Sequence, residues 1–144
     1  MAAQQRQIEI HYPDLNITLA ANLHEEKNPE LCNLMWDNLP IETIQSHTMS
    51  TGEAMYCPHR IVALVKSQTE LITEMPVGSV CMSVIDYKSF SIYYGKRTEP
   101  LPNSPVALIR REDLEKLKEV GKRAWEANYL THFPLRVVFR RKER

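Results

Sequence analysis

Short segments in which apolar and polar residues alternate dominate this chain, and only two stretches show helical spacing instead. Alternation with a period of two places the apolar side chains on one face of a β-strand. Many short strands with two helices favour a mostly β domain: a closed or nearly closed barrel whose ends the helices cap. Strands are predicted at residues 8–12, 17–23, 41–49, 53–57, 78–85, 90–94, 106–109 and 135–139, and helices at 29–39 and 111–128.

The first helix has recognisable boundaries. Asn28 fits the N-cap position, Pro29 fits the first turn, and Glu30 suits the positive end of the helix dipole. Pro40 ends the helix because proline cannot donate a backbone hydrogen bond. Trp36 within this helix belongs either to the core or to the rim of a pocket.

Two apolar stretches make more specific predictions. Gly121 lies on the apolar stripe of the second helix, which predicts close packing of that helix against a sheet. The run at residues 61–65 is either a buried strand or a loop that lines a site.

The composition is that of an ordinary globular domain. With 144 residues, 43% hydrophobic and 25% charged, the chain suits one domain over residues 1–144 with a short basic tail at 140–144. Its 18 basic and 18 acidic residues cancel, so nucleic acid and membrane surfaces are not expected partners. There is no long apolar span and no signal-peptide pattern at the start. Three cysteines without a CxxC pair predict reduced thiols and a cytoplasmic protein.

The stretch from His47 to His59 holds the densest group of chemically useful side chains. It contains two His, a Glu, a Cys, a Tyr and three hydroxyl residues, with Gly52 at a predicted turn. A hairpin around this glycine would bring His47 and Glu53 close enough for an acid and a base to cooperate. The alternative interpretation is an ordinary hairpin whose polar residues face water.

Further side chains could bind a substrate beside this pair. Tyr94 could donate a hydrogen bond or stack on a flat ring, although strand register decides whether Tyr93 or Tyr94 faces the site. Arg60 or Arg97 could hold a carboxylate by two parallel hydrogen bonds, and the alternative for each is a surface ion pair. The predicted substrate-binding set is Thr51, Arg60, Tyr94, Arg97 and Trp36.

Other reaction types have less support in the sequence. His47 and His59 lack a second close pair of ligands, so no metal site is predicted. Cys57 could act as a nucleophile with His59 two residues away, but a reactive thiol needs an electropositive setting that the sequence does not indicate. No glycine-rich phosphate loop is present, and no cofactor is predicted.

Several motifs together resemble a known family. They are the early strand pair through Leu23, PELCNLMWDNLP at 29–40, the pattern from His47 to Thr-Gly-Glu at 51–53, SIYYG at 91–95 and the helix at 113–128. In this order they resemble a small bacterial family of cyclophilin-like single domains. That family is related to the cyclophilin-like part of the larger opine synthases that make cucumopine and mikimopine. The resemblance implies a cyclophilin-like barrel and a cofactor-free Pictet–Spengler ring closure between histidine and 2-oxoglutarate.

A second, local resemblance concerns residues 59–68, HRIVALVKSQ. This segment is similar to the one that supplies the catalytic Arg and Gln in true cyclophilins, with Arg60 and Gln68 at the matching positions. Val65 occupies the aromatic position, and the Gly-Gly-Asp-Phe that follows in that family is missing. The match is therefore partial.

The sequence thus predicts a cofactor-independent enzyme of opine-synthase type that joins an amino acid to a 2-oxo acid. His47 and Glu53 would transfer protons, and the substrate-binding set would position the substrate. Homo-oligomerisation is left open. The first alternative is a non-catalytic protein that binds a small carboxylate on the same scaffold, and the second is a weak peptidyl-prolyl isomerase.

Overall fold

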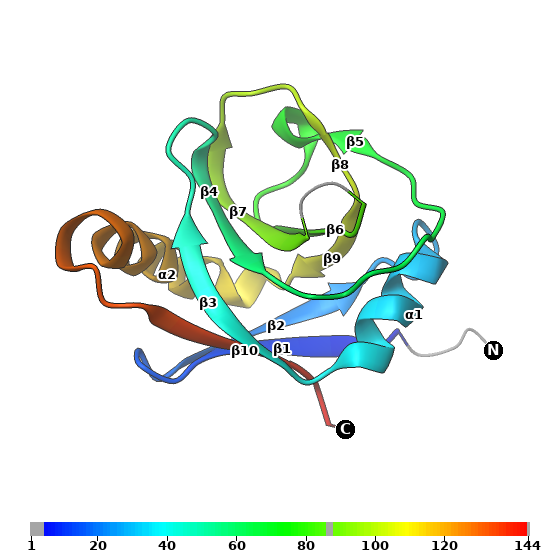
Figure 1. The fold of residues 1–144 in the computed structure, drawn as a ribbon, viewed down its shortest axis with the longest axis horizontal. Coiled ribbons are helices and arrows are strands. Elements are labelled where there is room, and N and C mark those ends of the chain that lie inside the picture. The colour runs from blue at the N-terminus through cyan, green and yellow to red at the C-terminus, as the bar shows by residue number, and fades with distance from the viewer. Residues whose placement is uncertain (1–4, 86–87, 144) are drawn as a thin grey trace.

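The computed structural model describes residues 5–85 and 88–143, and its main feature is a closed barrel (Figure 1). Eight strands form the barrel in the order β1-β10-β3-β4-β7-β6-β9-β2, and neighbouring strands are antiparallel. The predicted mostly β closed barrel with two helices is confirmed. The barrel strands are β1 Gln7–Tyr12, β2 Ile17–Leu23, β3 Ile41–His47, β4 Gly52–Pro58, β6 Ser79–Ser83, β7 Ser89–Arg97, β9 Pro105–Ile109 and β10 Leu135–Arg141.

Two helices flank the barrel on opposite sides in the view of Figure 1. Helix α1, Pro29–Asn38, and helix α2, Leu114–Glu126, each place an apolar stripe on the barrel core. The stripes consist of Leu31, Cys32 and Met35 in α1, and of Leu117, Val120 and Ala124 in α2. The smaller elements are β5 Glu70–Leu71 paired with β8 Pro102–Asn103, the 3-10 turns η1 Ile72–Glu74 and η2 Arg111–Asp113, and the π-helical turn η3 Ala127–Thr131.

The core follows directly from the alternation in the strands. In β1, for example, Ile8, Ile10 and Tyr12 are fully buried while the residues between them are half-buried. A second, smaller cluster lies on the other face of the sheet around β4, β6 and β7, where it is covered by η1. Its members are Ala54, Ile72, Met75, Cys81 and Tyr93. Burial of both faces of this part of the sheet makes it a rigid support for the residues at its edges.

Several boundaries differ from the predicted ones, and two of these differences have a clear cause in the pairing of the strands. Strand β7 was predicted to end at Gly95, but it continues to Arg97 because an irregularity in its pairing with β4 accommodates the glycine. The basic tail predicted at 140–144 is partly a strand: β10 extends to Arg141, and Arg140 forms an ion pair of 3.0 Å with Glu9. Arg144 lies outside the described residues. None of the helices in the described ranges is both long and apolar enough to span a membrane.

Candidate functional site

His47 and Tyr94 are joined by a hydrogen bond at one end of the barrel. His47 is the last residue of β3, and its Nε2 lies 2.6 Å from the Tyr94 hydroxyl of β7. The Nδ1 atom lies 2.6 Å from the carbonyl oxygen of Thr48. Because a carbonyl can only accept, Nδ1 carries the hydrogen, and Nε2 accepts the hydroxyl hydrogen of Tyr94. The imidazole is thus held as one neutral tautomer.

Burial keeps both partners of this hydrogen bond uncharged near neutral pH. It lowers the pKa of His47, an effect that the Thr48 carbonyl and the negative charge of Glu53 oppose. It also raises the pKa of Tyr94, and the Glu53 charge adds to that rise. The carboxylate of Glu53 is therefore close enough to act electrostatically on both groups. The structure thus brings His47, Glu53 and Tyr94 into one region, and their roles in proton transfer and substrate binding stay predictions.

The Glu53 carboxylate is held in place by the irregular pairing of β4 with β7. Its Oε1 accepts the backbone N–H of Lys96 at 3.0 Å, and it lies directly over Gly95. A Cβ atom at position 95 would overlap the carboxylate, so only glycine leaves the space that Glu53 occupies. The side chain is nevertheless exposed to solvent. An oriented, accessible carboxylate of this kind is suited to accept a proton from a bound molecule.

Two further aromatic residues, which were not among the predicted site residues, complete this region. The Trp125 ring meets His47 edge-on, with centroids 5.2 Å apart, and packs against Tyr129 at 4.4 Å. The Tyr129 hydroxyl donates a hydrogen bond of 3.2 Å to the His47 carbonyl. The indole of Trp125 is 42% exposed, so part of its surface is free to contact a ligand.

The helical spacing between Gly121 and Trp125 in α2 indicates that Trp125 lies near His47. Gly121 packs on the Tyr94 ring so closely that a Cβ there would lie 2.6 Å from two ring carbons, in agreement with the predicted close approach of the helix. A residue four positions later lies on the same helical face, which places Trp125 one turn further along beside His47. Tyr129 had no such signal because it lies beyond the predicted helix end, in the π-helical turn η3.

Arg97 has a different environment from the one predicted for a substrate ligand. Its guanidinium is buried and donates to the carbonyl oxygens of Ile72, at 3.0 Å, Gly95 and Met75. It also lies over the ring of Tyr93 at 5.4 Å. Since backbone acceptors occupy all three guanidinium nitrogens, Arg97 holds the fold together instead of presenting a free guanidinium to a substrate carboxylate.

Arg60 and Trp36 are far from His47. Strand β4 separates Glu53 from Pro58 by about 16 Å at roughly 3.3 Å per residue, and Arg60 follows beyond that end. Arg60 is exposed and borders a hollow of about 580 Å³. The guanidinium groups of Arg6 and Arg141 both lie over the ring of Trp36 in α1, at 5.2 and 4.8 Å from its centroid. The structure therefore does not bring these two residues together with the proton-transfer pair.

Thr51 has a structural role in the hairpin loop. Its hydroxyl donates to the Glu99 carboxylate at 3.1 Å, and its carbonyl accepts the N–H of Thr98 at 2.9 Å. These bonds tie the β3–β4 loop to the segment that follows β7. Thr51 thus supports the loop that leads into Glu53.

Cys57 and His59 are parts of the barrel interior. Cys57 is fully buried, and burial raises the pKa of its thiol well above the usual range, which opposes a nucleophilic role. His59 donates from Nε2 to the Ser83 carbonyl at 2.9 Å, and its Nδ1 accepts the N–H of Ile61 at 3.1 Å. Both ring nitrogens are occupied. Across residues 5–85 and 88–143 no group of three or more His, Cys, Asp or Glu side chains is arranged to hold a metal ion.

The candidate site combines a buried His47 with an exposed Glu53 and a partly exposed Trp125. A hollow of about 230 Å³ beside the end of β3 is lined by Gln45 and Ser46 together with Phe133 and Pro134. A second hollow of about 420 Å³ shares Phe133 and Pro134 with the first. Together they flank η3, which carries Tyr129, so a ligand held near His47 would have free space beside it.

The buried histidines predict a pH dependence of stability. The pKa values of His47 and His59 are lowered in the folded state, chiefly by burial, so the unfolded chain takes up protons first as the pH falls. Their contribution is complete above about pH 6.5 and is lost as the pH falls through the lowered folded values, with a slope of at most about 1.4 kcal/mol per pH unit for each histidine. Urea unfolding between pH 8 and pH 5 measures this slope, and His47→Gln should make it shallower. An unchanged slope in that variant would contradict the prediction.

Comparison with known proteins places the chain beside two solved structures. McbB, solved in complex with tryptophan, matches with a TM-score of 0.88 and 33% sequence identity, covering 95% of this chain and 45% of the McbB chain. The hypothetical protein AF2241 from Archaeoglobus fulgidus matches with a TM-score of 0.58 and 16% identity, covering 99% of this chain and all of AF2241. No family model and no curated protein matches the chain.

These matches support a related small barrel fold. The second has too little sequence identity to indicate more than the fold. The first is closer in sequence, but this chain spans less than half the length of McbB. The cyclophilin-like and opine-synthase parts of the sequence prediction stay predictions.

Proposed function

We propose that this domain binds an amino acid with a flat aromatic side chain beside His47, Glu53 and Tyr94, and condenses its amine with the carbonyl group of a 2-oxo acid. The observation that carries the proposal is the site itself: an oriented carboxylate acts on a hydrogen-bonded His–Tyr pair, and a partly exposed indole meets the imidazole edge-on. Proton transfer and stacking are the two things that such a condensation needs from a protein.

The proposed reaction runs in two stages. The substrate amine adds to the carbonyl carbon, and the resulting alcohol leaves as water to give an imine. A carbon of the aromatic side chain then attacks the imine carbon and forms the new C–C bond. That ring carbon finally loses its proton, which restores aromaticity. The net change is the loss of one water, with no oxidation or reduction.

The side chains have matching roles in this scheme. Glu53 takes the proton that the ring carbon releases, because its carboxylate is accessible and fixed by the Lys96 N–H. The Tyr94 hydroxyl donates its hydrogen to His47 Nε2, so its oxygen accepts a hydrogen bond from the substrate amine and holds that amine in position, while the departing hydroxyl takes a proton from solvent at this partly exposed site. Trp125 stacks on the flat ring of the substrate. Arg60, which follows the far end of β4, is too distant from Glu53 to take part.

The similarity to McbB supports the class of amine. McbB was solved with tryptophan, an amino acid whose side chain is a flat, electron-rich heterocycle. The opine-synthase resemblance implies histidine, which has the same general character. Both point to an amino acid whose ring carbon can attack an imine, and we propose this class as the substrate.

Mass spectrometry of the purified chain incubated with L-tryptophan or L-histidine and 2-oxoglutarate tests the proposal. The expected product has the combined mass of the two substrates less one water, above a protein-free control. Product in equal amounts with and without the protein would reject catalysis.

A binding protein without turnover is the second candidate. The observation that favours it is that both ring nitrogens of His47 already form hydrogen bonds within the protein. Thermal stabilisation by L-tryptophan without product would support this reading, since a ligand that binds only the folded state raises the melting temperature.

A further inference from the structure

The segment from Arg60 to Ser67 connects β4 to β5 and has the properties of an unpaired β-strand. In Figure 1 it is the long green coil that leaves the end of β4 and passes α1 on the way to β5. Its side chains alternate in burial: Ile61, Ala63 and Val65 are half-buried, whereas Val62 and Leu64 are 78% and 91% exposed. Alternation of this kind is the pattern of a strand that lies flat on a core.

The backbone of residues 62–65, in the middle of this segment, has no hydrogen-bond partner among the described residues. Within residues 5–85 and 88–143, no N–H or C=O group of residues 62–65 forms a hydrogen bond to another protein group. A row of free donors and acceptors on an extended chain is the template to which another strand adds. Val62 and Leu64, the two most exposed apolar side chains of the segment, belong to this same unpaired stretch.

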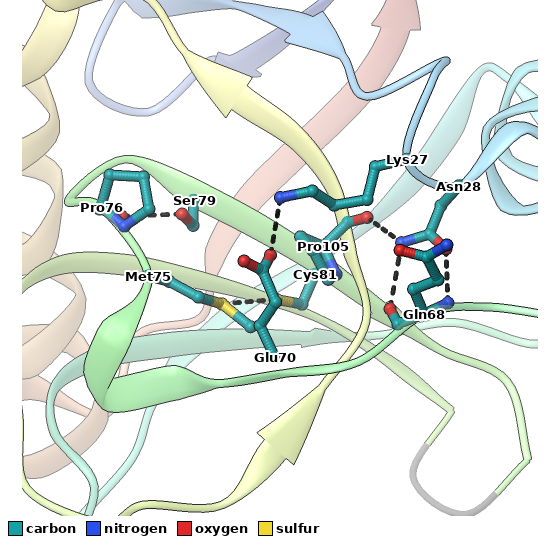
Figure 2. Close-up of polar contacts among 9 residues, drawn as sticks. All are labelled: Lys27, Asn28, Gln68, Glu70, Met75, Pro76, Ser79, Cys81 and Pro105. Atoms are coloured by element: carbon teal, nitrogen blue, oxygen red, sulfur yellow. Dashed lines mark hydrogen bonds and ion pairs between the residues drawn. The ribbon is translucent and has the colours of Figure 1, made fainter.

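Both ends of the segment are firmly attached. At the start, the N–H of His59 donates to Lys88 at 2.9 Å. At the far end, the buried side chain of Asn28 accepts the N–H of Gln68 at 2.6 Å and donates to its carbonyl at 3.2 Å (Figure 2). Asn28 precedes α1 as predicted, but it holds this segment instead of capping the helix. Fixed ends reduce the ordering cost of pairing with a partner.

The flanking charges indicate the kind of partner. Arg60 and Lys66 lie at the two ends of the apolar run, and neither has an ion-pair partner among the described residues. A second copy paired antiparallel about Ala63 would place Arg60 opposite Lys66 at both ends, which is repulsive. A strand with an acidic residue at each end would place opposite charges there instead.

We propose that residues 61–65 form a docking edge for an extended peptide segment of another protein, with a short apolar run flanked by acidic residues. The segment adds as an antiparallel strand: its backbone pairs with residues 62–65, its outward apolar side chains cover Val62 and Leu64, and its acids meet Arg60 and Lys66. This edge is independent of the condensation chemistry proposed for His47 and Glu53.

The test uses two blocked synthetic peptides and the chain as it is. Glu-Thr-Val-Thr-Val-Thr-Glu places valines opposite Val62 and Leu64 and glutamates opposite Arg60 and Lys66, and Lys-Thr-Val-Thr-Val-Thr-Lys differs only in charge. Calorimetric titration at low ionic strength should give a Kd about tenfold lower for the acidic peptide, and added salt should reduce the difference. Amide NMR signals of residues 62–65 should shift on binding.

Matched variants keep the test specific. The double variant Arg60→Glu with Lys66→Glu should reverse the preference between the two peptides. Leu64→Thr should weaken binding, whereas Leu101→Thr, at another exposed leucine, should not. Equal affinity for both peptides, or no binding by either, would overturn the proposal. Concentration-dependent dimerisation that Leu64→Thr abolishes would also overturn it, because the occupant would then be a second copy.

Discussion

Replacement of Glu53 by glutamine is expected to lower kcat for the proposed condensation by a factor of about 10²–10⁴, the usual contribution of a positioned proton acceptor. The reason is specific to the proton. A glutamine can still accept the N–H of Lys96 through its amide oxygen and fits over Gly95, so the local structure survives. What disappears is the ability to take a proton from the substrate ring. Steady-state kinetics with the best substrate pair measures the loss.

Two variants frame this result. Gly95→Ala keeps Glu53 but forces its carboxylate out of the space over residue 95. A loss of turnover in this variant would show that the position of Glu53 matters as well as its charge. Glu119→Gln, an exposed glutamate on α2, is the matched control and should be silent. Full turnover by a folded Glu53→Gln variant would remove Glu53 from the mechanism.

Replacement of Arg97 by methionine is expected to lower the free energy of unfolding by about 3–5 kcal/mol. Methionine keeps much of the apolar stem, but the carbonyl groups of Ile72, Gly95 and Met75 lose their donors. Each buried acceptor left without a partner costs about 1–3 kcal/mol. Urea unfolding followed by circular dichroism measures the change.

The same experiment separates the two roles considered for arginine at this position. Arg60→Met is the control, because an exposed arginine should change stability by no more than about 0.5 kcal/mol. If Arg97→Met retained wild-type stability but raised KM for the 2-oxo acid, the guanidinium would be binding substrate after all. A large loss of stability with unchanged KM in the folded fraction would establish the structural role.

The barrel was predictable because its cause is local. Alternation marks which side chains each strand buries, and the strand residues predicted from Ile17 to Leu23 agree with the structure at both ends. The capping residues likewise placed the start of α1 at Pro29. Predicted strand ends were wrong where pairing with a neighbouring strand outweighs a local turn signal. At Gly95, for example, β7 continues because its irregular pairing with β4 extends past the glycine.

Part of the candidate site was also predictable. His47 and Glu53 flank one turn, so their proximity follows from the hairpin alone. Tyr94 needed only the correct strand register, which the structure decides: Tyr93 lies in the smaller apolar cluster, while Tyr94 faces His47 and α2.

The sequence by itself thus determined the β-rich barrel, the two helices and the hairpin that unites His47 with Glu53, because each depends on neighbours within one element or turn. Only the tertiary structure decided the rest of the candidate site. It buried Arg97 against three carbonyl groups, separated Arg60 and Trp36 from His47, and brought Trp125 and Tyr129 beside it. Such contacts join residues far apart in the chain, and closure of the barrel rather than any local pattern sets which of them meet.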